Sequence, residues 1–170
     1  ASHLEPVGVD CHIGSQLTDI EPFIESVQHL RNLVLELRDW GVNIEHIDIG
    51  GGLGIQYANE TIPSPLDLIS AVRSELDPLG AELMIEPGRS IVGNAGVLLT
   101  QVLVEKAGDT KNFAIVDAAM NDLLRPALYS AWQNIVEVVT TDGANRKTYD
   151  IVGPVCETGD FLGKERDLVI

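Results

Sequence analysis

Two glycine-containing segments follow apolar runs and carry the residue types needed to bind an anion. Gly50-Gly51-Gly52 follows the run 47–49, and the sequence Glu-Pro-Gly-Arg at 86–89 follows the run 83–85. Backbone units without a Cβ atom let N–H groups approach an anion closely. The glycine spacing matches neither a nucleotide phosphate loop nor a dinucleotide fingerprint, and the triplet alone could simply be a tight bend. Together, the two segments predict a site for a phosphate-bearing cofactor.

The side chains near these segments could complete such a site. Glu86 could pair with a protonated ring nitrogen, and the resulting pyridinium could accept the electron pair of a carbanion. Arg89 could bind an anionic group. His12 could stack on a planar cofactor, and the hydroxyl of Ser15 could bind a phosphate. Simpler interpretations are a surface ion pair between Glu86 and Arg89 and a purely structural histidine.

Later in the chain, two segments contain further candidate groups. Arg125, in the irregular stretch 125–129, could form a forked pair with a carboxylate. Cys156 is followed by Glu157, and neighbouring negative charge disfavours the thiolate. The thiol is therefore better suited to donate a proton than to act as a nucleophile. Taken singly, each of these groups is more often structural than catalytic.

The elements that position the early segments alternate between strand and helix. Strands are expected at 7–12, 46–49 and 82–85. One helix is expected from Asp19, which can cap it, to about Gly41, with Pro22 in its first turn. Another is expected from Ser64 to about Gly80, with Asp67 completing a capping box. The apolar residues with helical spacing are Ile20, Phe23, Ile24, Val27, Leu30, Val34 and Leu37 in the first helix, and Ile69, Val72 and Leu76 in the second.

This alternation predicts parallel strands covered by helices, an α/β arrangement in which ligands bind at the carboxyl ends of the strands. Segments 12–15, 50–52 and 86–89 all fall at such ends. Five elements are too few to close an eight-stranded barrel, so the missing ones would have to precede Ala1. After residue 93 the pattern changes. Strands at 96–104, 112–117, 135–140, 149–152 and 167–170, with a turn at 142–143, predict a mainly antiparallel β region.

Composition narrows the function classes. The chain has 170 residues, 45% of them hydrophobic, and a formal charge of −15, which disfavours nucleic-acid binding and attachment to an anionic membrane. No apolar stretch approaches the roughly 20 residues of a transmembrane helix, and no signal peptide is evident. Two cysteines, Cys11 and Cys156, do not form a disulfide framework, so we expect a reducing cytoplasm.

Five ordered motifs make the signal far more specific. They are His-Ile-Gly-Ser-Gln at 12–16, Gly-Gly-Gly-Leu-Gly at 50–54, Glu-Pro-Gly-Arg at 86–89, Arg-Pro-Ala-Leu-Tyr at 125–129 and Cys-Glu-Thr-Gly-Asp at 156–160. Together they resemble the diaminopimelate decarboxylases, a family of fold-type III, alanine-racemase-like enzymes that depend on pyridoxal 5'-phosphate. This resemblance implies part of a cofactor-binding (β/α)₈ barrel over residues 1–93 and part of a β domain over 94–170.

The resemblance also implies roles for individual residues. His12 would stack on the cofactor ring and Glu86 would pair with its nitrogen. In a homodimer with shared active sites, Cys156 would donate a proton in the partner's site and Glu157 would read the far end of the substrate. The phosphate would be held by Ser15, Gly51, Gly52, Gly88 and Arg89, and the substrate carboxylates by Arg89, Arg125 and Tyr129.

The implied reaction converts meso-2,6-diaminopimelate into L-lysine and carbon dioxide, the last step of lysine biosynthesis. Members of the family hold the cofactor as a Schiff base on a lysine near the start of the barrel. None of Lys106, Lys111, Lys147 and Lys164 matches that lysine, so we expect the segment to be inactive alone. Alternatives are a related ornithine, lysine or arginine decarboxylase, a non-catalytic homologue that binds partners, and a phosphate-binding barrel enzyme without this cofactor.

Overall fold

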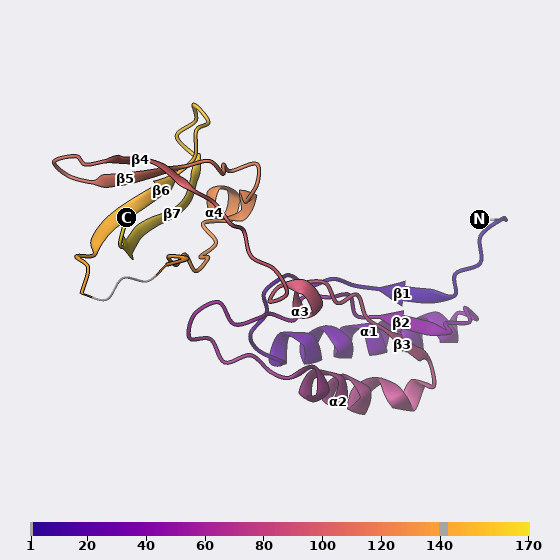
Figure 1. Cartoon of the computed structure of the whole chain (residues 1–170). Coiled ribbons are helices and arrows are strands. Elements are labelled where there is room, and N and C mark those ends of the chain that lie inside the picture. The colour runs from indigo at the N-terminus through magenta and orange to yellow at the C-terminus, as the bar shows by residue number, and fades with distance from the viewer. Residues whose placement is uncertain (1, 140–142) are drawn as a thin grey trace. The chain divides into compact units, whose positions relative to one another are not determined.

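A computed structural model describes residues 2–139 and 143–170. The chain forms two compact units, Ala1–Val97 and Leu98–Ile170, each of which is described by itself (Figure 1).

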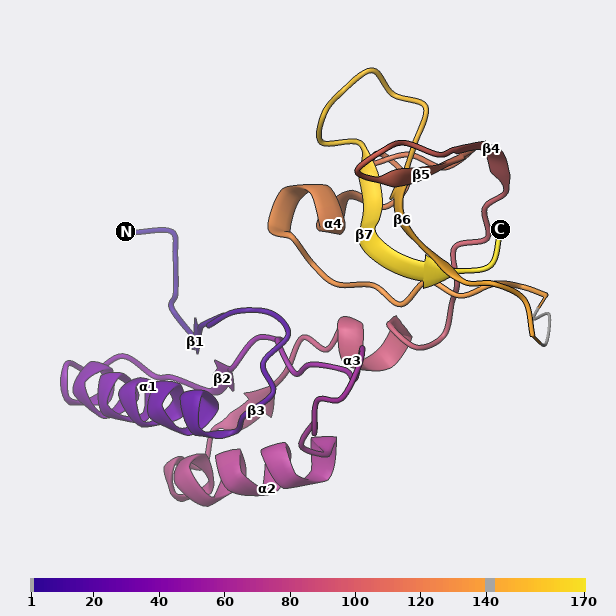
Figure 2. The same ribbon diagram turned by 90° about the vertical axis from the view of Figure 1, so that its left-hand side faces the viewer.

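The first unit is a parallel sheet with its connecting helices on one face. Strands β1 (Gly8–Asp10), β2 (His46–Asp48) and β3 (Glu82–Met84) pair in chain order, with Val9, Ile47 and Leu83 side by side. Helix α1 (Glu21–Asp39) links the first two strands. Helix α2 (Pro65–Leu76) and the short helix η1 (Asp77–Leu79) link the next two. Helices α1 and α2 pack against each other (Figures 1 and 2). The parallel arrangement predicted from the alternating elements is confirmed.

Helix α1 begins two residues after the predicted start. Its N-cap is Ile20, which offers no side-chain cap, and the carboxylate of Asp19 instead accepts a hydrogen bond from the backbone N–H of Glu21 at 3.1 Å. Pro22 lies in the first turn, as expected. The helix ends before Gly41, whose N–H donates to the carbonyl of Arg38 at 2.9 Å. The predicted helix is therefore confirmed, but not the role of Asp19 as its N-cap.

Helix α2 has the predicted capping box. The hydroxyl of Ser64 accepts from the N–H of Asp67 at 3.1 Å, and the Asp67 carboxylate accepts from the N–H of Ser64 at 3.2 Å. Of the three residues expected on the buried face of α2, Val72 and Leu76 are buried, and the third was wrong. Leu68 is buried and Ile69 is only half-buried, because 68, 72 and 76 repeat every four residues and face α1 and the sheet together.

The core of the first unit lies between the sheet and these two helices. Each fully buried aliphatic or aromatic side chain contributes roughly 1.5–3 kcal/mol relative to an exposed one, so this cluster stabilises the packing of the two helices on the sheet. Its buried members are Phe23, Val27, Leu30, Val34, Ile44, Ile47, Ile49, Leu53, Leu68, Val72 and Leu76.

The second unit is a four-stranded, mainly antiparallel sheet, as predicted. It contains β4 (Val102–Lys106), β5 (Asn112–Val116), β6 (Lys147–Val152) and β7 (Phe161–Leu168) in that spatial order. The outer pairs β4–β5 and β6–β7 are antiparallel, and the central pair β5–β6 is parallel.

Several local predictions for this unit were wrong. The expected strand at 135–139 does not form. The β-branched residues Val136, Val138 and Val139 are exposed, and the carboxylate of Glu137 accepts the N–H of Val169 at 2.8 Å. Residue 140 of the expected strand and residue 142 of the expected turn at 142–143 lie outside the described residues.

Strand and helix boundaries also shifted. The expected first strand, 96–104, starts instead at Val102. Strand β7 starts at Phe161, although a strand was expected only from residue 167. The charged residues in the middle of β7 hide the alternating apolar pattern that would predict a strand. There Glu165 adopts φ +54° and donates its N–H to the buried carboxylate of Asp150 at 2.9 Å. Two short helices were not predicted, α3 (Arg89–Val92) and α4 (Leu124–Tyr129).

Candidate functional site

The loops that follow β1, β2 and β3 meet at the carboxyl end of the sheet. The ladder continues beyond the strands, because the N–H of Cys11 donates to the carbonyl of Asp48 at 3.1 Å. The N–H of Glu86 donates to the carbonyl of Gly50 at 2.9 Å. The segments 12–16, 50–55 and 86–89 therefore lie side by side, as their positions at strand ends predicted.

The glycine triplet is required by the close passage of these loops. A Cβ atom on Gly51 would collide with the carbonyl oxygen of Glu86. A Cβ atom on Gly52, which has φ +110°, would collide with the carbonyl oxygen of Gly14. Anion approach was the predicted reason for the triplet. The structure adds a second reason, since any side chain here would push the three loops apart.

The imidazole of His12 is oriented by this same loop. The N–H of Gly51 donates to Nδ1 of His12 at 3.3 Å, so Nδ1 acts as an acceptor and the ring is held against the glycine loop. The side chain is exposed at the strand ends. An exposed, fixed, planar ring can stack on a flat ligand.

The guanidinium of Arg89 is held by two hydroxyl groups. It donates to the hydroxyl of Ser15 at 3.1 Å and to the hydroxyl of Tyr57, and its Cζ lies 5.7 Å from the centroid of the Tyr57 ring. Its Nε is buried and has no hydrogen-bond partner in the part of the chain that the structure describes. Within residues 2–139 and 143–170, Arg89 forms no ion pair. Its positive charge is therefore available to an anion.

Sequence reasoning missed Tyr57. It lies 32 residues before Arg89, in a loop without regular structure, and no motif or spacing distinguishes it from other loop aromatics. Only the fold brings its hydroxyl to the guanidinium.

Three carboxylates lie close together near the segment 86–89, which also carries Arg89. Oxygen atoms of Asp10, Asp48 and Glu86 lie within 4.8 Å of one another. Asp48 also accepts the N–H of Gly50 at 2.8 Å. The sequence analysis had singled out only Glu86, although Asp10 and Asp48 end paired strands in register and that position was a usable signal. Concentrated negative charge favours the protonated form of a basic ring nitrogen.

This donor set fits a phosphorylated pyridine. The Ser15 hydroxyl and the Arg89 guanidinium supply donors for a dianion, and Glu86 supplies an acceptor for a ring N–H. The backbone of Gly88, between Glu86 and Arg89, faces open space, since a Cβ atom there would meet nothing within 4 Å. Positive and negative ends thus lie on either side of one exposed turn.

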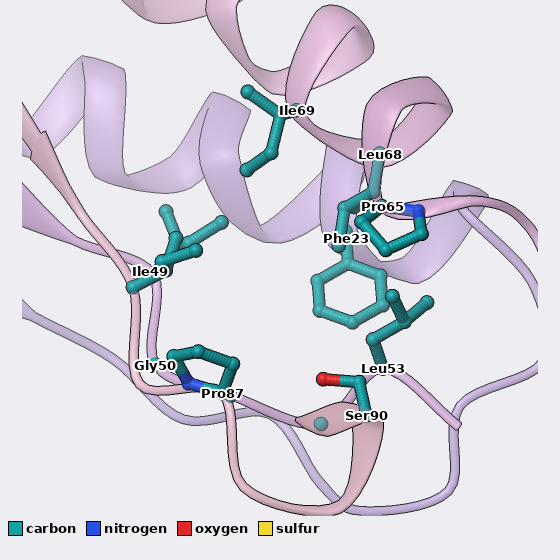
Figure 3. Close-up of a pocket in the computed structure, with 12 residues that line it drawn as sticks. Phe23, Ile49, Gly50, Leu53, Pro65, Leu68, Ile69, Pro87 and Ser90 are labelled. Carbon is teal, nitrogen blue, oxygen red and sulfur yellow. The ribbon is translucent and has the colours of Figure 1, made fainter. Parts of the chain in front are cut away.

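An apolar hollow lies against the glycine loop (Figure 3). Phe23, Leu68 and Ile69 reach it from the helices, and Pro87 and Ser90 line it from the turn after β3. Its volume of about 60 Å³ has room for roughly two water molecules, which is too little for a pyridine ring with its phosphate. It is a gap in the packing next to the candidate site.

The candidate residues of the second unit lie in two places. Arg125 and Tyr129 are on α4, with the guanidinium Cζ 4.9 Å from the ring centroid. The Nε of Arg125 is buried and has no hydrogen-bond partner among the described residues. The prediction of an irregular stretch at 125–129 was wrong, since these residues belong to the six-residue helix Leu124–Tyr129, which is too short to show a periodic apolar stripe. Cys156 and Glu157 are exposed on the loop between β6 and β7.

That loop is organised by a buried carboxylate. Asp160 is 4% exposed and accepts the N–H of Met120 and the N–H of Val155, both at 2.7 Å. These bonds join the loop that carries Cys156 and Glu157 to the chain after β5. The sequence analysis included Asp160 in a motif but gave it no role.

The four lysines named in the sequence analysis lie in the second unit, and three of them contact side chains of that unit. Lys111 bonds the carboxylate of Asp150 at 2.9 Å and Lys147 bonds that of Glu105 at 3.1 Å. Lys164 lies 4.0 Å from the centroid of the Phe161 ring. Lys106 ends β4.

These features define a class. The family model described as "Pyridoxal-dependent decarboxylase, C-terminal sheet domain" matches residues 10–169, and the chain belongs to this family.

Within that class, the chain is similar to diaminopimelate decarboxylases. It is 56% identical over 168 residues to that of Pseudomonas aeruginosa and 58% identical over 168 residues to that of Pseudomonas fluorescens. In both comparisons the alignment covers 99% of this chain and 40% of the relative. The chain therefore spans about two fifths of the length of these relatives.

Solved structures agree with this. A crystal structure from Aquifex aeolicus superposes with a TM-score of 0.93 at 46% identity, covering 99% of this chain and 42% of that one. Diaminopimelate decarboxylase from Helicobacter pylori, solved in complex with L-lysine, gives a TM-score of 0.89 at 42% identity, covering 98% of this chain and 41% of that one.

Among the described residues, no helix has the length and apolar character needed to cross a membrane.

Proposed function

We propose that this chain is part of a diaminopimelate decarboxylase that converts meso-2,6-diaminopimelate into L-lysine and carbon dioxide with pyridoxal 5'-phosphate. The observation that supports this best is the turn at 86–89. At one end it has an arginine that is bonded to the hydroxyl of Ser15 and forms no ion pair with any described residue, and at the other end it has a carboxylate. The identity to two diaminopimelate decarboxylases supports the choice of substrate.

In this proposal, residues 1–93 are part of a (β/α)₈ barrel that binds the cofactor. When bound, the cofactor supplies a protonated ring that can accept an electron pair. Glu86 keeps a proton on the ring nitrogen, and the neighbouring carboxylates of Asp10 and Asp48 raise the negative potential that favours it. His12 stacks on the ring. The phosphate is held by Ser15, Gly51, Gly52, Gly88 and Arg89.

Residues 94–170 are then part of the β domain, which supplies groups for the substrate. Arg125, stacked on Tyr129, is a fixed guanidinium suited to a carboxylate. Cys156 would deliver a proton in the partner's site of a homodimer, and Glu157 would bind the distal end of the substrate. We further propose a cytoplasmic location, and no activity for residues 1–170 alone, because none of their lysines matches the family's cofactor-bearing lysine.

The test is substrate preference in the protein encoded by the intact gene. We expect turnover of meso-2,6-diaminopimelate and none of ornithine, lysine or arginine. A preference for one of those three would identify a related decarboxylase. Absence of bound cofactor, read from its absorbance, would favour a non-catalytic homologue or an enzyme that binds a different phosphate.

A matched pair of variants tests the phosphate site. Truncating one partner of a buried, hydrogen-bonded charge pair costs about 2–5 kcal/mol. The half-buried Arg89 would form such a pair with the bound phosphate, so Arg89→Met should weaken cofactor binding by roughly 30-fold or more. Arg73→Met removes the exposed partner of Asp77 on α2 and should leave cofactor binding unchanged. Equal cofactor affinity in the two variants would show that Arg89 does not bind the phosphate.

A further inference from the structure

We propose that Gln16 is a positioning residue that locks the serine-bearing loop onto the glycine loop, so that both present one phosphate site. This inference rests on the proposed function, and it assigns a role to a residue that the proposal leaves unused.

The side-chain amide of Gln16 pairs with both backbone groups of a single residue. Its Nε2 donates to the carbonyl of Ile55 at 2.6 Å, and its Oε1 accepts the N–H of Ile55 at 3.1 Å. The two residues are 39 positions apart, and Ile55 is 6% exposed. Since both functional groups of the amide are used, the side chain acts as an added strand residue beside the glycine loop.

The neighbouring backbone continues the same pairing. The N–H of Leu17 donates to the carbonyl of Gly52, and the N–H of Gly54 donates to the carbonyl of Leu17, both at 2.9 Å. Residues 52–55 are therefore fixed by a row of four hydrogen bonds, of which Gln16 supplies two. Without them, within residues 2–139 the two loops would be held together by the hydrogen bonds of Leu17 and by the bond from Gly51 to His12.

Two local features indicate that the arrangement is specific. Gln16 has φ +60°, a left-handed conformation that is unfavourable for a residue other than glycine and is held here by the two amide bonds. A Cβ atom on Gly54 would lie 3.2 Å from the amide carbon of Gln16 and 2.9 Å from the carbonyl of Leu17. The last glycine of the 50–54 motif therefore leaves room for the amide.

The residues locked together are those proposed for the phosphate. Ser15 immediately precedes Gln16 and is bonded to Arg89, and Gly52 lies at the other end of the row of hydrogen bonds. The amide of Gln16 directs both of its groups to the backbone of Ile55 and not to Glu86 or His12, the residues proposed for the pyridine ring. Loss of the amide should therefore weaken the hold on the phosphate far more than the hold on the ring.

The experiment compares two ligands with the apo form of the protein encoded by the intact gene: pyridoxal 5'-phosphate and pyridoxal, which lacks the phosphate. For Gln16→Ala we expect a 10- to 100-fold weaker affinity for pyridoxal 5'-phosphate, from two lost hydrogen bonds, and at most about a threefold change for pyridoxal. Gln56→Ala is the matched control. Gln56 is exposed and bonds only within its own loop, to the carbonyl of Ala58 at 3.1 Å, so neither affinity should change.

A second variant separates hydrogen bonding from packing. Gln16→Met keeps the length of the side chain and loses both bonds, so it should show the same phosphate-specific loss, and it decides the matter if Gln16→Ala does not fold. Equal losses for the two ligands, or affinities like those of the unmodified protein in both variants, would refute the positioning role. Failure of the unmodified protein to prefer pyridoxal 5'-phosphate over pyridoxal would instead overturn the proposed function, and this inference with it.

Discussion

The substitution Asp160→Asn should loosen the loop that carries Cys156 without unfolding the protein. The carboxylate of Asp160 is 4% exposed and accepts two backbone N–H groups, from Met120 and Val155, through different oxygens at 2.7 Å each. Asparagine has a single side-chain oxygen. One of the two bonds must be lost, and an amide NH₂ group is placed against a backbone donor.

The size of the effect follows from the bond that is lost. A hydrogen bond to a charged acceptor contributes about 1.5–3 kcal/mol, so about 2 kcal/mol is expected here. At about 1.4 kcal/mol per factor of ten, the open form of the loop should become roughly 30-fold more populated. In the full-length protein, amide hydrogen exchange of peptides covering 118–122 and 153–160 should accelerate by about that factor, while exchange in α1 should not change.

The control is an aspartate of the same chemistry in an exposed position. Asp122 accepts one backbone N–H, that of Ala119, at 2.8 Å. Asparagine keeps one side-chain oxygen that can accept this single bond, so Asp122→Asn should change exchange by no more than about threefold. Similar exchange rates in the Asp160 and Asp122 variants would refute the conclusion that the buried carboxylate organises the loop.

Three further predictions concern stability and are measured on the full-length protein. Leu68→Ala should cost about 2–5 kcal/mol in urea unfolding, whereas Leu66→Ala, at a side chain that is 74% exposed, should cost less than about 0.5; equal costs would contradict the assigned helix face. Ser64→Ala should lower the free energy of unfolding by about 1 kcal/mol through loss of the cap, and no change would mean that the box is not formed in solution. Burial opposes ionisation of Asp150, but bonds from Lys111 and a backbone N–H outweigh it and hold the pKa of Asp150 below its ordinary value. The stabilisation that the ionised Asp150 gives to the folded protein should therefore be complete above about pH 4. It should be lost as the pH falls through the lower pKa that Asp150 has in the folded state. Asp150→Asn should flatten this acid limb of a plot of Tm against pH, and an unchanged limb would argue against the pairing.

Helices of the first unit could be read from the sequence because their signals are local. Ser64 and Asp67 are three residues apart, and Gly41 follows the last turn of α1, so capping and termination depend on near neighbours. The choice between Leu68 and Ile69 could not be made locally. Both lie on the apolar side of α2, and the packing of α1 and the sheet decides which is fully buried.

Predictions for the second unit failed where pairing with a distant strand decides whether a segment forms a strand. Residues 135–139 have strand propensity, yet no strand of the described chain pairs with them, and Glu137 is bonded to Val169 instead. The β7 strand runs through charged residues because β6 pairs with it, with the buried Asp150 accepting the N–H of Glu165. Strand formation depends on a distant partner, which propensity does not report.

The sequence by itself determined which residue types could perform the chemistry and that His12, Glu86 and Arg89 stand at strand ends, because motif order and hydrophobic period are properties of the chain. Only the tertiary structure decided what those side chains touch. It placed Tyr57 on Arg89, Asp10 and Asp48 beside Glu86, and Gln16 on Ile55. The physical reason is that these contacts join residues 32 to 76 positions apart, whose separation is fixed by strand register and helix packing rather than by local geometry.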